Sequence, residues 1–455
     1  MILRTIIISV AVLAATIATA ATHEYTVTLS SDLSSLDVEA RLAPGVRRLS
    51  ARSRDARDSL VRMRDCDTGN ELPGTSRTVE SDDDLRCLSY SVDLRRIERP
   101  DRRSYFTRAT IVVPVTDWMW RPRLGGNDEI VVSFRLPDGI GVSVPWRPLE
   151  DGAHRFLLRS SPQSGTGLSV FGQFDRQVVD VAGASLRIVS LPSETNPIGA
   201  EAIRWTQQTA EIITLAYGRF PNPHARVILF PVTSRRDSSA VPFGRVVRDG
   251  GETIELLMDP GRPSEAFTDD GTATHEFSHL MLPYITRDER WVSEGFAQYY
   301  QNVLLARAGR YSQQDAWRKL REGLERGRES VPDLSPNEAA GGGERNSRMK
   351  IYWSSAALAL MADIELRRRS GGAESLDQVL ERLQACCLPS RRTWSGRDLF
   401  EKLDSLIETP LFMELYDRHA DAPGFPDFEP LLERPEFAEI RAAITARRYT
   451  GEPDK

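Results

Sequence analysis

The strongest chemical signal in the sequence is a pair of histidines and a glutamate with helical spacing. Residues 274–279 read T-H-E-F-S-H and contain the pattern H-E-x-x-H, in a chain with only 6 histidines. Residues four positions apart lie on one face of a helix, so His275 and His279 can bind one metal ion. Glu276 is rotated away from that face, which lets its carboxylate reach a water bound to the metal. The pattern therefore predicts a metal site with an adjacent base, and a pair of core histidines is the alternative.

Glu294 is the expected third ligand, because a hydrolytic zinc site needs three protein ligands and one open position. It lies in the segment W-V-S-E-G-F-A-Q-Y-Y, whose aromatic residues form an apolar stripe. A carboxylate on the inner side of such a helix is costly unless it is paired or bound to a metal. The residues between His279 and Glu294 include Pro283 and suit a turn that lays the second helix beside the first. The alternative is a surface glutamate at a helix N-terminus, where the helix dipole favours it.

The first part of the chain has the pattern of many short β-strands. From Tyr25 to about Leu191, apolar and polar residues alternate, and clusters of Pro, Gly and Asp separate the runs. This pattern is typical of an antiparallel β-sandwich. We expect the polar stretch from Ser50 to Asp84 to be an inserted loop or hairpin.

Beyond about residue 195 the apolar residues follow a helical period. A helix is expected to begin near Pro197, followed by a buried strand at 227–230. A second strand is expected at 253–258, where Glu255 suits the edge of a sheet. Three further helices are then expected at 297–325, 350–370 and 374–387. A Pro- and Gly-rich loop is expected at 332–346, between the first two of them.

These patterns predict an α+β multidomain fold. We expect a β-sandwich domain at 21–191, an α/β catalytic lobe at 192–310 and a helical C-terminal lobe at 311–455. Residues 1–20 read as a signal peptide, with Arg4 before an apolar run and A-T-A as the cleavage site, which leaves Ala21 as the first mature residue. The alternative to a cleaved signal peptide is an uncleaved membrane anchor, for which the apolar run is short. No membrane span is expected in the mature chain.

The second ligand segment resembles a known family of peptidases. H-E-x-x-H followed by W-x-x-E-G-x-A-x-Y-Y is similar to the gluzincin metallopeptidases, and within them to the glycyl aminopeptidase family, which is related to aminopeptidase N. The likeness continues through residues 299–309 and 356–365 and covers most of residues 24–430. It implies one zinc ion per chain, a thermolysin-like catalytic lobe and peptide or protein substrates.

The resemblance implies two further site residues. Relatives of aminopeptidase N place a Tyr ahead of K-G-A, where its hydroxyl supports the oxyanion, and the matching run here is Y-W-S-S-A, which begins at Tyr352. In the relatives an edge strand pairs with the substrate backbone and a Glu holds the substrate amine. Glu252, ahead of the presumed edge strand, is the nearest equivalent. The alternatives are that Tyr352 packs the start of a helix and that Glu252 is a turn residue.

The sequence departs from the family pattern in several places. The gap between His279 and Glu294 is shorter than in the aminopeptidase N relatives, so the connection between the two zinc helices must be tighter. Ser354 and Ser355 replace the Lys and Gly that follow the Tyr, and no G-x-M-E-N precedes the zinc helix. We also expect no counterpart of the C-terminal PDZ domain found in many family members, because the chain ends at Lys455.

Composition excludes some functions and indicates a compartment. The net charge is -6 and the charges are well mixed, which is unlike the basic face of a nucleic-acid-binding protein. The four cysteines would be oxidised after export and allow three pairings. Cys66 and Cys87 lie in one polar stretch and could close a modest loop, whereas Cys386 and Cys387 are adjacent. No C-x-x-C spacing favours a zinc site made of these thiols.

The sequence therefore predicts an exported zinc metallopeptidase, periplasmic or secreted, with an aminopeptidase as the first expectation. Glu276 would take a proton from the attacking water and pass it to the leaving amine, while Tyr352 supports the oxyanion. Two alternatives stay open: an endopeptidase with the same site, and a non-catalytic envelope protein that binds peptides.

Overall fold

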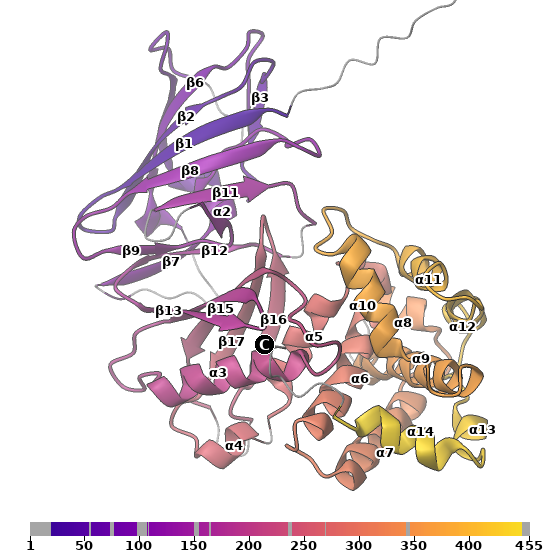
Figure 1. Cartoon of the computed structure of the whole chain (residues 1–455). Coiled ribbons are helices and arrows are strands. Elements are labelled where there is room, and N and C mark those ends of the chain that lie inside the picture. Colours follow the sequence, from indigo (N-terminus) through magenta and orange to yellow (C-terminus); the bar gives the residue numbers. More distant parts are fainter. Residues whose placement is uncertain are drawn as a thin grey trace, which may run out of the picture.

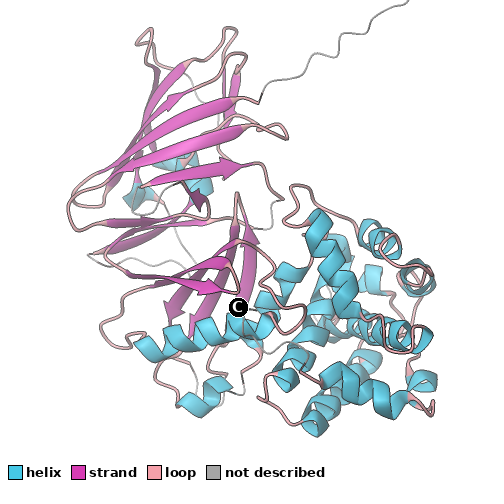
Figure 2. Ribbon diagram, viewed as in Figure 1, coloured by secondary structure: helices cyan, strands magenta, loops and turns pink. Residues whose placement is uncertain are grey.

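The computed structural model describes residues 20–53, 56–72, 77–97, 107, 109–149, 154–162, 165–234, 239–268, 270–342 and 346–447. The expected signal peptide therefore lies outside the described residues, apart from Ala20. The chain forms an N-terminal β-domain, a central sheet with helices on one face, and a helical region (Figures 1 and 2).

The β-domain encloses its core between sheets. Its seven-stranded sheet has the order β10-β11-β8-β1-β2-β6-β4 and its three-stranded sheet has the order β7-β12-β9. Buried residues alternate along β1, and large aromatic side chains such as Trp118 and Trp146 fill the core. The elements of this domain are β1 Thr22–Leu29, β2 Ser35–Arg41, β3 Arg48–Ser50, α1 Ala56–Ser59, β4 Leu60–Asp65, β5 Thr78–Glu80, β6 Cys87–Asp93, η1 Leu94–Arg96, β7 Thr110–Pro114, α2 Val115–Trp118, β8 Glu129–Arg135, β9 Gly141–Ser143, β10 Arg147–Pro148, β11 Arg155–Arg159 and β12 Leu168–Gly172.

Two expectations for this domain are corrected. The large sheet is mixed rather than antiparallel, because β1 and β8 run parallel although they are far apart in sequence. The stretch from Ser50 to Asp84 is not simply an inserted loop, since it contributes β4 to the large sheet and β5 to a pair with β3. β4 is an edge strand in which only Met63 is buried, so its sequence shows no alternation.

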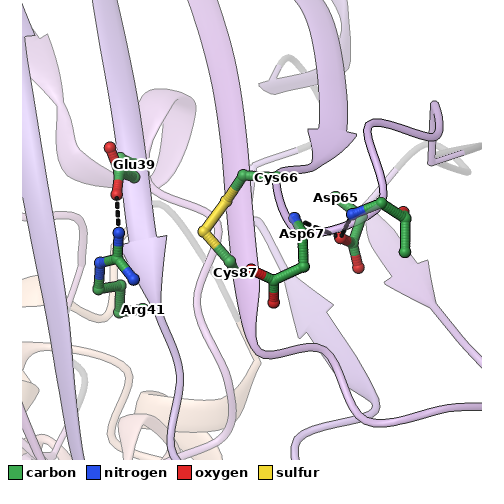
Figure 3. Close-up of a disulfide and its surroundings, with 7 residues drawn as sticks. Glu39, Arg41, Asp65, Cys66, Asp67 and Cys87 are labelled. Carbon is green, nitrogen blue, oxygen red and sulfur yellow. Dashed lines mark hydrogen bonds and ion pairs between the residues drawn. A yellow bond between two sulfur atoms is a disulfide. The ribbon is translucent and has the colours of Figure 1, made fainter.

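A disulfide fastens this edge strand. Cys66, just after β4, is bonded to Cys87 at the start of β6, with 5.3 Å between the Cα atoms. Figure 3 shows the bond beside the ion pair of Arg41 and Glu39 on β2, whose side chains are 3.0 Å apart. Cys386 and Cys387 form the second disulfide. The pairing that the sequence left open thus joins Cys66 to Cys87, 21 residues apart, and Cys386 to Cys387, which are adjacent.

The central sheet has the order β13-β14-β15-β17-β16. β14, β15 and β17 are parallel, while β16 runs antiparallel at one edge. One face packs on β7 and β12 through an apolar cluster that includes Val112, Ile228 and Leu257. The opposite face is covered by α3 and α5. The elements here are β13 Asp175–Val181, β14 Ala184–Ser190, α3 Ala200–Ile213, β15 His224–Pro231, β16 Phe243–Arg248, β17 Glu252–Met258, α4 Ser264–Thr268, α5 Thr272–Ser278 and η2 His279–Met281.

Two expectations for this region are also corrected. β13 and β14 belong to the central sheet, so this sheet begins before residue 191, the expected boundary. The change from strand to helical periodicity near residue 195 marks the first helix of this region, α3. Its first strand, β13, comes earlier in the chain. The expected edge strand at 253–258 lies inside the sheet, and Glu255 is tolerated there because Arg245 of β16 pairs with it at 2.8 Å.

The helical region follows. The expected helix at 297–325 is two helices, α6 and α7, because Gly309 has a positive φ of 72° and Ser312 caps a new helix. The expected loop at 332–346 contains α8, which Ser335 and Glu338 begin with a capping box. No helix in the described part of the chain is both long and apolar enough to cross a membrane. The elements are η3 Arg287–Glu289, α6 Trp291–Arg307, α7 Gln313–Glu329, α8 Pro336–Gly341, α9 Arg348–Arg369, α10 Leu376–Cys387, α11 Gly396–Asp404, α12 Phe412–His419, α13 Glu429–Leu432 and α14 Phe437–Thr445.

Candidate zinc site

The H-E-x-x-H segment forms the short helix α5 and the turn that continues it. Ala273, Phe277 and Leu280 recur at helical spacing and are buried in the core. They orient the opposite side of the helix, with His275 and His279, toward α6. The turn ends at Leu282, which is extended because Pro283 follows it. The helical spacing used in the sequence analysis is therefore present in the fold.

The two histidines and Glu294 converge. The Nε2 atom of His275 lies 3.2 Å from Oε2 of Glu294, and that of His279 lies 3.6 Å from the same oxygen. One ligand atom from each of the three residues lies within 4.8 Å of the others. Two imidazoles and a carboxylate are a donor set that zinc binds in hydrolytic sites, and such spacing suits three ligands around one ion. The residues present therefore fit a zinc ion.

The charges of His279 and Glu294 shift the pKa of each other's side chain. Burial lowers the pKa of His279, but the Glu294 carboxylate outweighs this effect and raises the pKa overall. Burial likewise raises the pKa of Glu294, while His279 and His275 lower it to well below the usual value for glutamate. Glu294 is therefore held as a carboxylate, the form in which it binds a metal ion.

Glu276 is buried beside the ligands and touches the edge strand. A Cβ atom at Gly244 of β16 would lie 2.5 Å from Cγ of Glu276, so only glycine allows this approach. Burial raises the pKa of Glu276, and Glu294 raises it further, whereas the two histidines lower it. A carboxylate whose pKa is raised in this way is suited to accept and return a proton.

Tyr352 comes to the same site from α9. Its ring stacks on that of His275, with the ring centroids 5.5 Å apart. The guanidinium of Arg348, one turn earlier on α9, lies 5.5 Å from the Tyr352 ring centroid. Burial raises the pKa of Tyr352 and the carboxylates of Glu294 and Glu276 raise it further. The phenol therefore keeps its proton and can donate a hydrogen bond.

Glu252 is engaged elsewhere. Its carboxylate pairs with Arg248 at 2.8 Å, at the end of the β16–β17 hairpin. Arg248 also donates hydrogen bonds to the carbonyls of His279, at 2.9 Å, and Leu282, at 3.2 Å. Glu252 thus holds an arginine that holds the end of the zinc helix. The structure does not bring it into the ligand cluster, and a contact with a substrate amine stays a prediction.

A buried polar network fixes α6 against α9 and α10. The Tyr299 hydroxyl donates to Asp363 at 2.8 Å and the Tyr300 hydroxyl donates to Asp377 at 3.1 Å. Arg307 pairs with Asp377 at 2.8 Å. All these groups are buried and charged or phenolic, so the network holds one relative position of the helices that carry Glu294 and Tyr352.

Sequence reasoning missed strand β16 with Gly244 and Arg248. Its signal was present but weak, since Val246 and Val247 precede the turn formed by Gly250 and Gly251, and a second strand follows. Only the antiparallel pairing with β17 brings Gly244 to the side chain of Glu276.

Comparisons with known proteins give one family match over part of the chain and several solved structures with a similar fold. The family model of M61 glycyl aminopeptidase matches residues 282–334, which include Glu294. Among solved structures, an aminopeptidase N family protein from Idiomarina loihiensis is 13% identical with a TM-score of 0.64, covering 90% of this chain and 78% of that one. The chain is therefore similar to glycyl aminopeptidases over one segment and to an aminopeptidase N family protein in its fold.

A similar fold occurs in a second group of solved structures. The M1 zinc metallopeptidase from Deinococcus radiodurans is 15% identical with a TM-score of 0.52, covering 95% of this chain and 96% of that one. A mutant of that enzyme bound to a Tyr-Ser-Ala substrate is 14% identical with a TM-score of 0.53, covering 90% of this chain and 95% of that one. No curated protein sequence matches this chain.

Proposed function

We propose that this protein is an exported zinc aminopeptidase that binds one zinc ion through His275, His279 and Glu294. The observation that carries the proposal is the meeting of these three ligands with Glu276 and Tyr352, which come from four separate elements. When bound, zinc would act as a Lewis acid and lower the pKa of a water molecule to about 7.

Glu276 is the proposed base. It adjoins His275 in the chain, and the surroundings that bury it raise its pKa, so proton transfer in both directions is accessible. It would take a proton from the attacking water and later deliver it to the leaving amine. The contact with Gly244 holds its side chain at the edge strand, where the substrate backbone is expected.

Tyr352 is the proposed oxyanion donor. Its raised pKa keeps the hydroxyl protonated at neutral pH, so it can donate to charge that develops on the scissile carbonyl oxygen. Stacking on His275 fixes the ring next to the ligand cluster.

The edge strand β16 would bind the peptide. As the last strand of the central sheet, it pairs on only one side with another strand of the described chain, and an extended peptide can pair on its other side. Phe243, which is 44% exposed at the start of this strand, would contact a substrate side chain. The aminopeptidase assignment draws on the names of the matched family and of the structural relative from Idiomarina loihiensis.

Export is proposed from the N-terminal sequence and the cysteines. Residues 1–20 have the charge, apolar run and cleavage motif of a signal peptide. Both disulfides of the described chain suit an oxidising compartment such as the periplasm or the outside of the cell.

The test measures bound zinc and peptide cleavage together, using the mature chain from Ala21. We expect about one zinc per chain. Glu294→Ala should lose the zinc. Glu276→Gln should keep the zinc and lose about 100- to 10,000-fold in turnover. Glu265→Gln, at an exposed position on α4, is the matched control and should behave as the wild type.

Peptides with free and acetylated N-termini separate the alternatives. An aminopeptidase cleaves only the free form, whereas equal cleavage of both would identify an endopeptidase. A wild-type protein that holds zinc but cleaves neither form would indicate a peptide-binding protein, and retention of zinc by Glu294→Ala would remove Glu294 from the ligand set.

A further inference from the structure

A cavity outside the zinc-ligand cluster lies where the β-domain, the central sheet and the helical region meet. Its volume is about 240 Å³, and its wall includes Arg147 of β10, Arg187 of β14 and Arg391 in the loop after α10. Figure 1 shows that loop near the tip of the β16–β17 hairpin. The Arg391 guanidinium donates to the carbonyl of Gly126 at 2.7 Å, so the loop is attached to the β-domain. Each of the three parts of the fold thus supplies one of these three arginines.

These three arginines differ from the other arginines of the wall. Arg159 pairs with Glu129 at 2.5 Å, and Arg248 pairs with Glu252 at 2.8 Å. Within the described parts of the chain, Arg147, Arg187 and Arg391 form no ion pair with a carboxylate. The carboxylates of the described residues therefore leave the positive charge of these three arginines unpaired.

Arg187 is the most buried of the three arginines and is only 7% exposed. Its guanidinium donates to the backbone carbonyls of Val144, Pro145 and Trp146, at 3.4, 3.4 and 2.9 Å. Its register partner on β15 is Arg226, which is also buried. Burial, and then the charge of Arg176, lower the pKa of Arg187 to about 10. A buried cation next to a second one is costly unless an anion compensates it.

We propose that this cavity binds a phosphate-type oxyanion, either free inorganic phosphate or a phosphomonoester on a small molecule. Guanidinium groups recognise phosphate through paired hydrogen bonds. Here they come from three separate parts of the fold. A tetrahedral anion can accept hydrogen bonds from several directions at once, whereas the two oxygens of a carboxylate lie in one plane.

The rest of the wall can complete the hydrogen bonding. It includes the hydroxyls of Ser160 and Ser390, the amide of Asn222 and the ring of His224. Burial, and then Arg147 and Arg187, lower the pKa of His224. Its ring is therefore neutral at pH 7 and can donate a hydrogen bond without adding a further positive charge.

Binding at this position would join the three parts of the molecule. The turn at Gly250 and Gly251 forms one wall and is docked tightly on the β-domain, since a Cβ at Gly251 would lie 2.1 Å from the Pro145 carbonyl oxygen. Arg391 belongs to a loop that reaches the cavity from the helical region. A ligand that binds only this assembled arrangement stabilises the folded protein as its concentration rises.

The test uses the full mature protein with zinc and measures inorganic phosphate binding by calorimetry, together with the midpoint of thermal unfolding. We expect saturable binding and a rising midpoint in the wild type. Arg147→Gln and Arg391→Gln should each weaken phosphate binding about tenfold, since one ion pair to phosphate is lost. Both residues are exposed, so these variants should fold. Arg41→Gln removes an equal charge from β2 and should bind phosphate as the wild type does.

Binding of other anions identifies which phosphate compound the cavity prefers and whether it selects phosphate over other negative charges. Glycerol phosphate that binds more tightly than inorganic phosphate would indicate a phosphomonoester ligand, and the reverse would indicate the free ion. Succinate and sodium chloride at matched ionic strength should have little effect. The proposal is overturned if phosphate binds the wild type and both variants equally, or if succinate and chloride raise the unfolding midpoint as much as phosphate does.

Discussion

At the scale of single residues, a variant of Tyr352 tests its proposed role as oxyanion donor. Tyr352→Phe keeps the ring that stacks on His275 and removes only the hydroxyl. We expect kcat to fall about 100- to 1,000-fold, with little change in KM or zinc content, because the hydroxyl acts on charge present only in the transition state. Steady-state kinetics and metal analysis check this, with Tyr311→Phe as the control. An unchanged kcat would exclude Tyr352 from the oxyanion site.

Glu365 makes a pH-dependent contribution to stability. Hydrogen bonds from Arg368, and then from Arg369, outweigh its burial and lower its pKa from 4.5 to about 2. Its stabilising effect is therefore complete above about pH 4.5 and disappears as the pH falls toward 2. Glu365→Gln should lower the free energy of unfolding by about 1–2 kcal/mol at pH 7.

Urea unfolding at several pH values tests this effect. The difference between the wild type and Glu365→Gln should close as the pH falls below about 4.5. Glu322→Gln, which removes an exposed pair with Arg318, should change the free energy of unfolding by less than about 1 kcal/mol. A difference for Glu365→Gln that does not depend on pH would assign the effect to packing.

At the scale of elements, the contact between α6 and α9 sets the geometry of the site. A Cβ at Gly295 would lie 2.5 Å from both the backbone nitrogen of Ala356 and Cβ of Ser355. Gly295→Ala must therefore separate the two helices that hold Glu294 and Tyr352. We expect a loss of about 1–3 kcal/mol in stability, as for other overpacked contacts, together with weaker zinc binding.

Thermal unfolding and zinc titration of Gly295→Ala measure both effects. Gly341→Ala, at the end of α8, is the matched control because its added methyl group would meet no described residue within 4 Å beyond its chain neighbours and its own helix backbone. If Gly295→Ala bound zinc as tightly as the wild type, the helix contact would not determine the site.

At the scale of the whole molecule, Asp249 joins the β-domain to the central sheet. It is 1% exposed, pairs with Arg121 at 3.2 Å and accepts a hydrogen bond from the Gly167 amide at 3.1 Å. Asp249→Ala leaves Arg121 without its partner, so we expect a loss of about 3–5 kcal/mol.

Urea unfolding followed by two probes shows whether the parts separate. In Asp249→Ala, near-ultraviolet and far-ultraviolet signals should no longer change together if the β-domain loses its connection to the rest. Asp138→Ala, in an exposed turn, is the control. Coincident transitions with unchanged stability would mean that the apolar cluster at Val112, Ile228 and Leu257 holds the two parts by itself.

The sequence by itself predicted that His275, His279 and Glu294 meet, and the structure brings these three residues into one cluster. This was possible because His275, Glu276 and His279 lie within two turns of one helix, where spacing alone determines direction. Glu294 followed from the cost of a carboxylate on an apolar helix. The pairing of the three ligands in one cluster agrees with that local reasoning.

Only the tertiary structure decided which strand lies at the edge and what surrounds the site. The neighbour of a strand depends on pairing between distant segments, so the sequence placed the edge at 253–258, whereas β16 occupies it. The same long-range pairing joined β13 and β14 to the central sheet and ran β1 parallel to β8. The close approach of Gly244 to Glu276 and the meeting of arginines from three parts of the chain also depend on contacts that no local pattern contains.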